Sequence, residues 1–337
     1  MKIAFHNVYK EINKNNFLFE SLNTSLGDEL LLPFHHLKNV AALRGIDCAT
    51  TDIYGVDELD VCVFIDYPQD EKIINNLVSL NKKIYLIMFE SKLINKKNWD
   101  LGNHKAFNKV FTWCDDIVDN VKYFKINFAQ KGTQDFSPID FKNKKLVTLI
   151  ASNKLENSAG ELYSKRIEVI RYFEQKHPEL FDLYGIGWDY YRFSGKLRFL
   201  NIINKLPYKL KRITNKYKSY RGPLKNKRAK LSEYKYSICF ENFTGVNGYI
   251  TEKIFDCFLA GVVPIYWGAD NIEDHIPKNC YIDYRNFKNN DEMLNHILNI
   301  SESEYDTYLK NIKNYLNSDS FYPFSLGCFA ETLLRDL

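Results

Sequence analysis

The stretch YSICFENFTGVNGYITEKIFDCFLAGVVPIYW, residues 236–267, indicates the fold class most directly. Its two apolar ends, Tyr236–Phe240 and Val262–Trp267, are short and rich in β-branched and aromatic residues, which is typical of buried strands. Between them we expect a helix over Thr251–Ala260, because its first residue is a good N-cap and Gly261 is a good helix stop. Strand, helix and strand in this order predict a βαβ unit.

The same alternation continues along the chain and predicts an α/β fold with mainly parallel sheets. In the first half we expect strands at Lys2–Phe5, Cys48–Ile53, Val61–Ile65, Ile84–Phe89 and Val110–Trp113, and helices at Leu31–Leu43 and Glu71–Leu80. In the second half we expect further strands at Leu146–Ala151 and Phe181–Ile186, and helices at Glu161–Gln175, 290–299, 302–316 and Leu326–Leu337.

Residues 130–145 interrupt this pattern with Gly, Pro, Ser and charged residues, which favours a domain boundary there. A chain of 337 residues is long enough for two domains. We therefore expect an N-terminal domain over 1–140 and a second domain over 146–320. A C-terminal helix within 321–337 is expected to pack back on the first domain.

The composition, 45% apolar and 26% charged, excludes a disordered or fibrous chain. The seven cysteines are scattered and never spaced CxxC, which argues against a disulfide framework or a zinc ribbon and favours a reducing compartment. The first residues read as a strand and not as a signal peptide. The longest apolar stretch, near 257–267, is too short to span a bilayer.

Positive charge is concentrated in one segment, residues 196–230, which carries thirteen Lys or Arg and no Asp or Glu. The rest of the chain carries 33 basic and 42 acidic residues. Two interpretations of this segment are equally good. It is either a solvated surface segment or a site of contact with a phosphate-bearing ligand, an anionic membrane or nucleic acid.

Polar residues follow several of the predicted strands directly. They are Asp66, Glu90, Ser152 with Asn153, and Glu241 with Asn242. Ligands of open parallel sheets bind beyond the carboxyl ends of the strands, so these residues are candidates for a binding cleft. Any one of them can also be an ordinary polar loop residue.

Two cations stand where cations are unexpected. Arg166 lies in the apolar stripe of the helix Glu161–Gln175, so it needs an anionic partner, which is either a structural carboxylate or a bound phosphate or carboxylate. Lys253 lies in the first turn of the next helix, where it opposes the helix dipole unless it helps to hold an anion. The alternative for Lys253 is a surface lysine.

No metal site is expected. Asp115, Asp116 and Asp119 are interpreted as a helix-capping cluster, and the adjacent His35 and His36 have no third ligand in view. The chain also lacks the glycine pattern of a P-loop and that of a dinucleotide-binding unit.

The stretch CFENFTGVNGYITEKIFDCFLAGVVPIYWG, residues 239–268, resembles the signature of the α1,3-fucosyltransferases of glycosyltransferase family 10. Phe-Glu-Ser at 89–91 is similar to a block of the family's first domain. Ala-Ser-Asn at 151–153, followed by Arg166, is similar to a second block. The resemblance covers most of 146–290 well and 84–126 loosely.

The resemblance implies a GT-B architecture, with two Rossmann-like domains facing across a cleft. It also implies inverting, metal-independent transfer of L-fucose from GDP-fucose, which would be a substrate, so that no cofactor is expected. Glu90 matches the general base, and Glu252 is assigned with it as a catalytic carboxylate. Arg166 and Lys253 match the diphosphate contacts. The other donor-binding candidates are Ser152, Asn153, Glu241, Asn242 and Tyr249.

Two residues depart from the family pattern. Lys92 replaces a frequent proline, and Phe243 replaces a frequent serine, which makes a GDP-sugar donor a firmer expectation than fucose itself. The expected acceptor is a GlcNAc or Glc unit of a surface polysaccharide or lipopolysaccharide, linked α1,3. A cytoplasmic enzyme at the inner face of the membrane, with no nucleic-acid partner, is expected. The alternatives are a GT-B transferase with another nucleotide sugar and a non-catalytic binder of anionic polymer or membrane through 196–230.

Overall fold

The structure is a computed structural model that describes residues 1–21, 29–132, 140–189, 199 and 217–335. The chain divides into two compact units. The first unit comprises Met1–Gly132 and Phe321–Leu337, and the second comprises Thr133–Ser320. Most of the predicted basic segment, 196–230, therefore lies outside the described residues.

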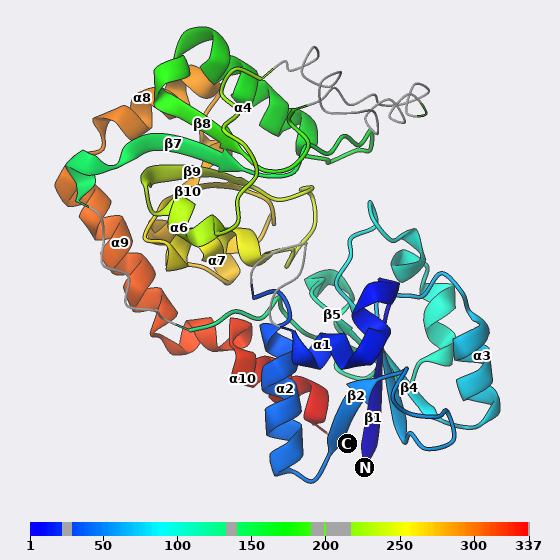
Figure 1. Cartoon of the computed structure of the whole chain (residues 1–337). Helices are drawn as coiled ribbons and strands as arrows, with labels where there is room; N and C mark the ends of the chain where they lie inside the picture. Colours follow the sequence, from blue (N-terminus) through cyan, green and yellow to red (C-terminus); the bar gives the residue numbers. More distant parts are fainter. Residues whose placement is uncertain (22–28, 133–139, 190–198, 200–216, 336–337) are drawn as a thin grey trace. The chain divides into compact units, whose positions relative to one another are not determined.

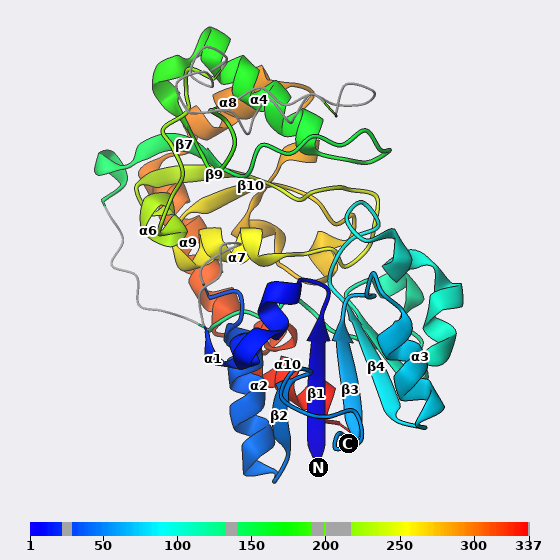
Figure 2. The ribbon, with the colours of Figure 1, turned by 45° about the vertical axis from the view of Figure 1, so that its right-hand side comes forward.

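The first unit contains a six-stranded parallel sheet in the order β2-β1-β3-β4-β5-β6. The strands are β1 (Lys2–Asn7), β2 (Asp47–Thr50), β3 (Val61–Ile65), β4 (Lys83–Met88), β5 (Lys109–Thr112) and β6 (Tyr123–Lys125). Strands β1, β3 and β4 lie side by side in Figure 2. The unit's α-helices are α1 (Phe17–Glu20), α2 (Leu32–Leu43), α3 (Lys72–Ser79) and α10 (Leu326–Leu334).

Successive side chains of these strands enter two different cores, as the two-residue period of a strand requires. In β1, Ile3 and Phe5 join the core that contains α2 and α10, whereas Ala4 joins the core that contains α3. Because both faces of the sheet are covered, its central strands β3 and β4 are mostly apolar, and this is why the sequence pattern predicts them.

The second unit contains a five-stranded parallel sheet in the order β11-β10-β9-β7-β8. The strands are β7 (Lys145–Ile150), β8 (Phe181–Tyr184), β9 (Tyr234–Phe240), β10 (Val263–Trp267) and β11 (Ile282–Asp283). The α-helices are α4 (Tyr163–Lys176), α6 (Lys227–Leu231), α7 (Glu252–Leu259), α8 (Asn290–Asn299) and α9 (Glu302–Leu316). Helices α4 and α8 lie on one side of this sheet, and α6 and α7 lie on the other (Figure 1).

Short 3-10 helices connect the elements of both units. They are Lys10–Asn16, Lys96–Trp99, Leu101–Ala106, Asp115–Ile117, Phe141–Asn143, Pro178–Leu180, Ile272–Asp274, Lys278–Cys280, Tyr284–Asn286 and Asp319–Phe324.

The predicted elements are observed with boundaries that differ by a few residues. The strand predicted over Cys48–Ile53 is wrong at its end: β2 stops at Thr50 because the chain then turns, with the Ile53 amide donating to the Thr50 carbonyl. Strands β6 and β11 were not predicted, since two or three residues give no readable period.

Helix α10 completes the core of the first unit. Its residues Phe329, Ala330, Leu333 and Leu334 are buried there. The Phe329 ring packs edge-on against Phe34 of α2, with 5.4 Å between ring centroids. The alanine in the contact face allows the two helices to approach closely.

We expect Phe329→Ala to lower the free energy of unfolding by about 3–5 kcal/mol, because it removes a buried ring and leaves a cavity. Denaturant unfolding followed by far-UV circular dichroism measures the change. Leu43→Ala, at an 89% exposed position of α2, is the control and should change stability by less than about 0.5 kcal/mol. Equal effects of the two substitutions would contradict this account of α10.

Candidate active site

The central feature of the second unit's site is a carboxylate that follows β9. Glu241 has no exposed surface. Its Oε1 accepts hydrogen bonds from the Thr251 amide (2.9 Å) and hydroxyl (3.0 Å), and its Oε2 accepts from the Lys253 ammonium at 3.0 Å. A buried carboxylate is stable only when paired in this way. Glu241, predicted to bind the donor, thus directs both its oxygens to residues of the chain itself.

Lys253 is the cation held by Glu241. Its Nζ also contacts the Thr251 hydroxyl at 2.8 Å and lies 3.6 Å from Glu252 Oε1. Burial lowers the pKa of Lys253, but the charges of Glu241 and Glu252 outweigh that effect and raise it, while the nearby Arg166 charge opposes them. The ammonium therefore stays charged at neutral pH, and its position is fixed relative to the first turn of α7.

Glu252 is the first residue of α7, and its side chain is 42% exposed. Burial of the carboxyl would raise its pKa, but the charges of Lys253 and Lys227 dominate and lower the pKa to about 2. Glu252 is therefore ionised near neutral pH. In this state it can accept hydrogen bonds but has no proton to donate.

Arg166 lies in the buried face of α4 and is only 5% exposed. The sequence predicted that Arg166 pairs either with a carboxylate of the chain or with a bound anion. The first of these predictions is wrong, because no carboxylate of the described residues lies within ion-pair distance of Arg166. Instead Nη2 donates to the carbonyls of Phe240 (2.6 Å) and Glu241 (2.8 Å) and to Asn242 Oδ1 (3.2 Å). The guanidinium is thus fixed at the end of β9 with its charge unneutralised by these partners.

Asn242 connects Arg166 to the loop before α7. Its Nδ2 donates to the Tyr249 hydroxyl at 3.4 Å, and its carbonyl accepts from the Leu162 amide at the start of α4. The ring of Phe243, the departure from the family pattern, lies against the ring of Tyr249, with centroids 4.4 Å apart. The end of β9, the start of α4 and the loop before α7 are therefore joined in one network.

Ser152 and Asn153 follow β7, which neighbours β9 in the sheet. Asn153 is buried, its Nδ2 donates to the Gly187 carbonyl at 2.8 Å, and its Oδ1 has no hydrogen-bond donor among the described residues. Gly185 is required nearby, because its φ is +127° and a Cβ would lie 1.9 Å from the Ala151 carbonyl oxygen. No hydrogen bond of the described residues joins Ser152 or Asn153 to the β9 network.

Glu90 belongs to the first unit, two residues after β4. Its Oε1 accepts a hydrogen bond from the Tyr9 hydroxyl at 2.6 Å. Burial and the Glu90 charge raise the pKa of Tyr9, so this phenol remains a donor. No pattern in the amino-acid sequence pointed to Tyr9, which follows β1 in an irregular segment.

Two members of the acidic cluster, Asp115 and Asp119, have structural partners. Asp115 pairs with Lys125, and Asp119 Oδ1 accepts from the amides of three turn residues. No group of three or more metal-ligating side chains was found in the described parts of the chain. In the described end of the basic segment, Lys227 and Arg228 both pair with Asp256.

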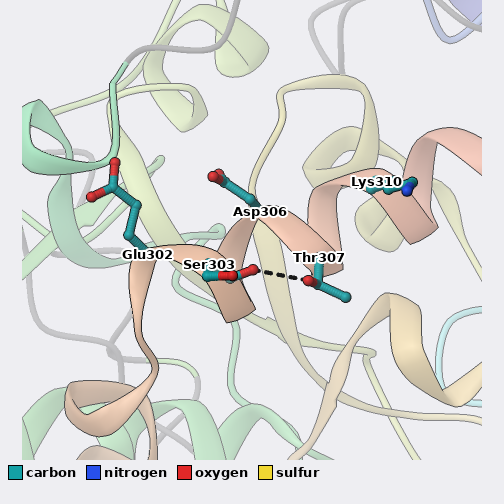
Figure 3. A pocket seen from close by; sticks show the side chains of 5 residues that line it. All are labelled: Glu302, Ser303, Asp306, Thr307 and Lys310. Carbon is teal, nitrogen blue, oxygen red and sulfur yellow. Dashed lines mark hydrogen bonds between the residues drawn. The ribbon is translucent and has the colours of Figure 1, made fainter.

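A surface hollow on α9 is unrelated to these residues. It is lined by exposed side chains of that one helix: Glu302, Ser303, Asp306, Thr307 and Lys310 (Figure 3). None of them is a site candidate. None of the helices in the described ranges combines the length and apolar character needed to cross a bilayer.

The amino-acid sequence matches a family model over residues 190–322, and that model describes the C-terminal part of glycosyltransferase family 10 (fucosyltransferase). The chain is 35% identical over 121 residues to alpha-(1,3)-fucosyltransferase FucT of Helicobacter pylori. That match spans 34% of this chain and 25% of the relative's length.

Solved structures resemble the chain over nearly its whole length. One is an alpha1,3-fucosyltransferase with GDP-fucose, with a TM-score of 0.54 and 17% identity, covering 99% of this chain and 89% of that one. Another is HepE of Anabaena with UDP and glucose, with a TM-score of 0.54 and 10% identity, covering 98% and 97%. These structures and the two parallel sheets confirm the predicted α/β fold of the GT-B class. The family match adds that residues 190–322 are similar to the C-terminal part of the fucosyltransferases of glycosyltransferase family 10.

Proposed function

We propose that this protein transfers L-fucose from GDP-fucose to a hydroxyl group of a glycan, with inversion at the anomeric carbon. The observation that carries the proposal is the pair of fixed cations at the end of β9. Lys253 is held by a buried carboxylate, and Arg166 is held by backbone carbonyls. The two positive charges repel each other, and the charge of Arg166 accordingly lowers the pKa of Lys253. A diphosphate bound beside both would relieve that repulsion.

The proposed reaction is a single displacement. The acceptor oxygen forms a bond to the anomeric carbon while the bond from that carbon to the diphosphate oxygen breaks, and GDP leaves. Arg166 and Lys253 stabilise the negative charge that develops on the diphosphate. Glu90 takes the proton of the acceptor hydroxyl as general base. Glu252, Asn242 and Tyr249 contact the donor, with Glu252 as an ionised hydrogen-bond acceptor in the transition state.

The acceptor that we propose is a GlcNAc or Glc unit of a surface glycan, linked α1,3. The expected location, in the cytoplasm and at the inner face of the membrane, stays a prediction from the sequence. The alternative of an anionic-polymer binder gains no support from the described end of the basic segment, because Lys227, Arg228 and Arg221 there pair with carboxylates of the same unit.

A donor panel tests the proposed function. We expect product formation by mass spectrometry with GDP-fucose and GlcNAc-containing acceptors, and less than about a hundredth of that rate with GDP-mannose or UDP-sugars. EDTA should leave the rate unchanged, because the two side-chain cations carry the role of a metal. A product formed from another nucleotide sugar, or loss of turnover in EDTA with recovery in manganese, would contradict the proposal.

Glu90→Gln should lower kcat by about 10²–10⁴-fold, because the amide cannot accept the proton. The stabilisation of the protein by GDP in a thermal shift assay should stay unchanged, since the proposed donor residues belong to the second unit. Glu71→Gln, an exposed carboxylate of the first unit paired with Lys97, is the control. Normal turnover by Glu90→Gln would exclude that residue as the base.

Lys253→Ala should weaken GDP binding by about 10–100-fold in calorimetric titration, the usual loss for a hydrogen bond to a charged group. The substitution also leaves Glu241 buried without its cation, which costs about 3–5 kcal/mol of stability. The double variant Glu241→Gln with Lys253→Ala removes that cost and should recover stability but not GDP affinity.

Lys176→Ala, which removes a half-exposed partner of Asp291 at the other end of α4, is the matched control and should bind GDP normally. If the double variant binds GDP as tightly as the wild type, Lys253 does not contact the diphosphate.

A further inference from the structure

Asp66 is a buried carboxyl whose conformation is unusual. It follows β3 directly, is 3% exposed, and has a backbone φ of +63°. Aspartate tolerates this left-handed conformation, but glycine adopts it without steric cost. If the turn were the only requirement at this position, glycine would be favoured. The presence of a carboxyl side chain therefore needs another explanation.

The explanation lies in the neighbouring strand exit. Asp66 Oδ1 accepts hydrogen bonds from the amides of Phe89 and Glu90, both at 2.8 Å, and from Asn98 Nδ2 at 2.6 Å. Asn98 Nδ2 also donates to the Glu90 carbonyl at 3.1 Å, and its Oδ1 accepts from the Tyr67 amide. One carboxylate oxygen thus fixes the two residues that leave β4.

The two carbonyls of the same segment are held by indole groups. Trp113 Nε1 donates to the Phe89 carbonyl at 3.0 Å, and Trp99 Nε1 donates to the Glu90 carbonyl at 3.1 Å. All four backbone polar groups of residues 89 and 90 therefore have side-chain partners. Ordinary strand exits are held by backbone or solvent, so this segment is unusually restrained.

The arrangement is costly in free energy. Asp66 has no cation within ion-pair distance among the described residues. The pKa of Asp66 is raised to about 7, because burial and the charge of Glu90 outweigh the hydrogen bonds from the Glu90 amide, Asn98 and the Phe89 amide, which lower it. A residue that is both conformationally strained and poorly solvated is typical of a functional site.

We propose that Asp66 is a positioning residue for Glu90, which fixes the backbone of residues 89 and 90 so that the Glu90 carboxylate meets the Tyr9 hydroxyl in one orientation. The proposal rests on the proposed role of Glu90 as general base. Asp66 itself touches no substrate in this account.

The first test measures the geometry without any reaction. Hydrogen exchange of the indole protons in ¹⁵N-labelled protein reports on Trp99 and Trp113. Asp66→Gly suits the backbone conformation and removes only the carboxylate, so it should speed exchange at both indoles by at least about tenfold. Trp188, which donates to the Ala151 carbonyl in the second unit, is the internal control. Asp60→Asn, an exposed carboxylate that precedes β3, is the control variant.

The second test measures catalysis. Asp66→Gly should lower kcat by about 10–100-fold, as expected when a base is misplaced, with KM for the donor changed less than threefold. Asp66→Asn keeps an acceptor oxygen toward the three donors and should recover kcat to within about fivefold of the wild type. A merely structural role would lower the amount of folded protein and leave kcat per folded molecule unchanged.

The outcomes separate the two proposals. Unchanged indole exchange in Asp66→Gly, or full kcat per folded molecule, would overturn the role of Asp66. If the wild-type protein transfers no fucose but the indole exchange changes as expected, the proposed function is overturned, and Asp66 then has no role in catalysis. The account of how Asp66 restrains the backbone of residues 89 and 90 would still stand.

Discussion

A carboxylate without any exposed surface determines the geometry of the second unit's site. Glu241 joins the end of β9 to the start of α7, because its oxygens are shared between Thr251 and Lys253. Its packing also constrains β10: a Cβ at Gly268 would lie 2.4 Å from the Glu241 Cγ, so only glycine fits after the strand. Several features of one stretch of sequence thus follow from burying a single charge.

The first unit uses the same principle with a different result. Asp66, like Glu241, is a buried acid at a strand exit that fixes the neighbouring segment. Glu241 presents a cation to its surroundings, whereas Asp66 has no cationic partner among the described residues and presents another carboxylate, Glu90. In the function that we propose, the positive charge of one unit would meet the leaving diphosphate, and Glu90 of the other would act as the base toward a hydroxyl group. This division of chemistry is the basis of the proposed transfer from a GDP-sugar.

Much of the fold was predictable because parallel strands covered on both faces are apolar without interruption. Strand β3 was predicted at its observed bounds, and β4 and β10 within one residue at each end. The partners of Arg166 were not predictable, since carbonyl oxygens at a strand end carry no signal in the side-chain sequence. Asp66 was recognisable as a polar strand exit, but its hydrogen bonds to residues 89 and 90 depend on the register of β3 with β4. Tyr9 reaches Glu90 from an irregular segment and Asn98 from a short 3-10 helix, and no periodicity in the sequence describes either path.

The return of the chain to its first unit affects how the protein is made. The core around α2 includes Phe329, Leu333 and Leu334, which are synthesised after all of Thr133–Ser320. During translation, the apolar side chains of the first unit that pack against α10 therefore stay uncovered until the ribosome has synthesised the whole second unit. Such a delay exposes nascent chains to aggregation and gives chaperones a defined surface to cover.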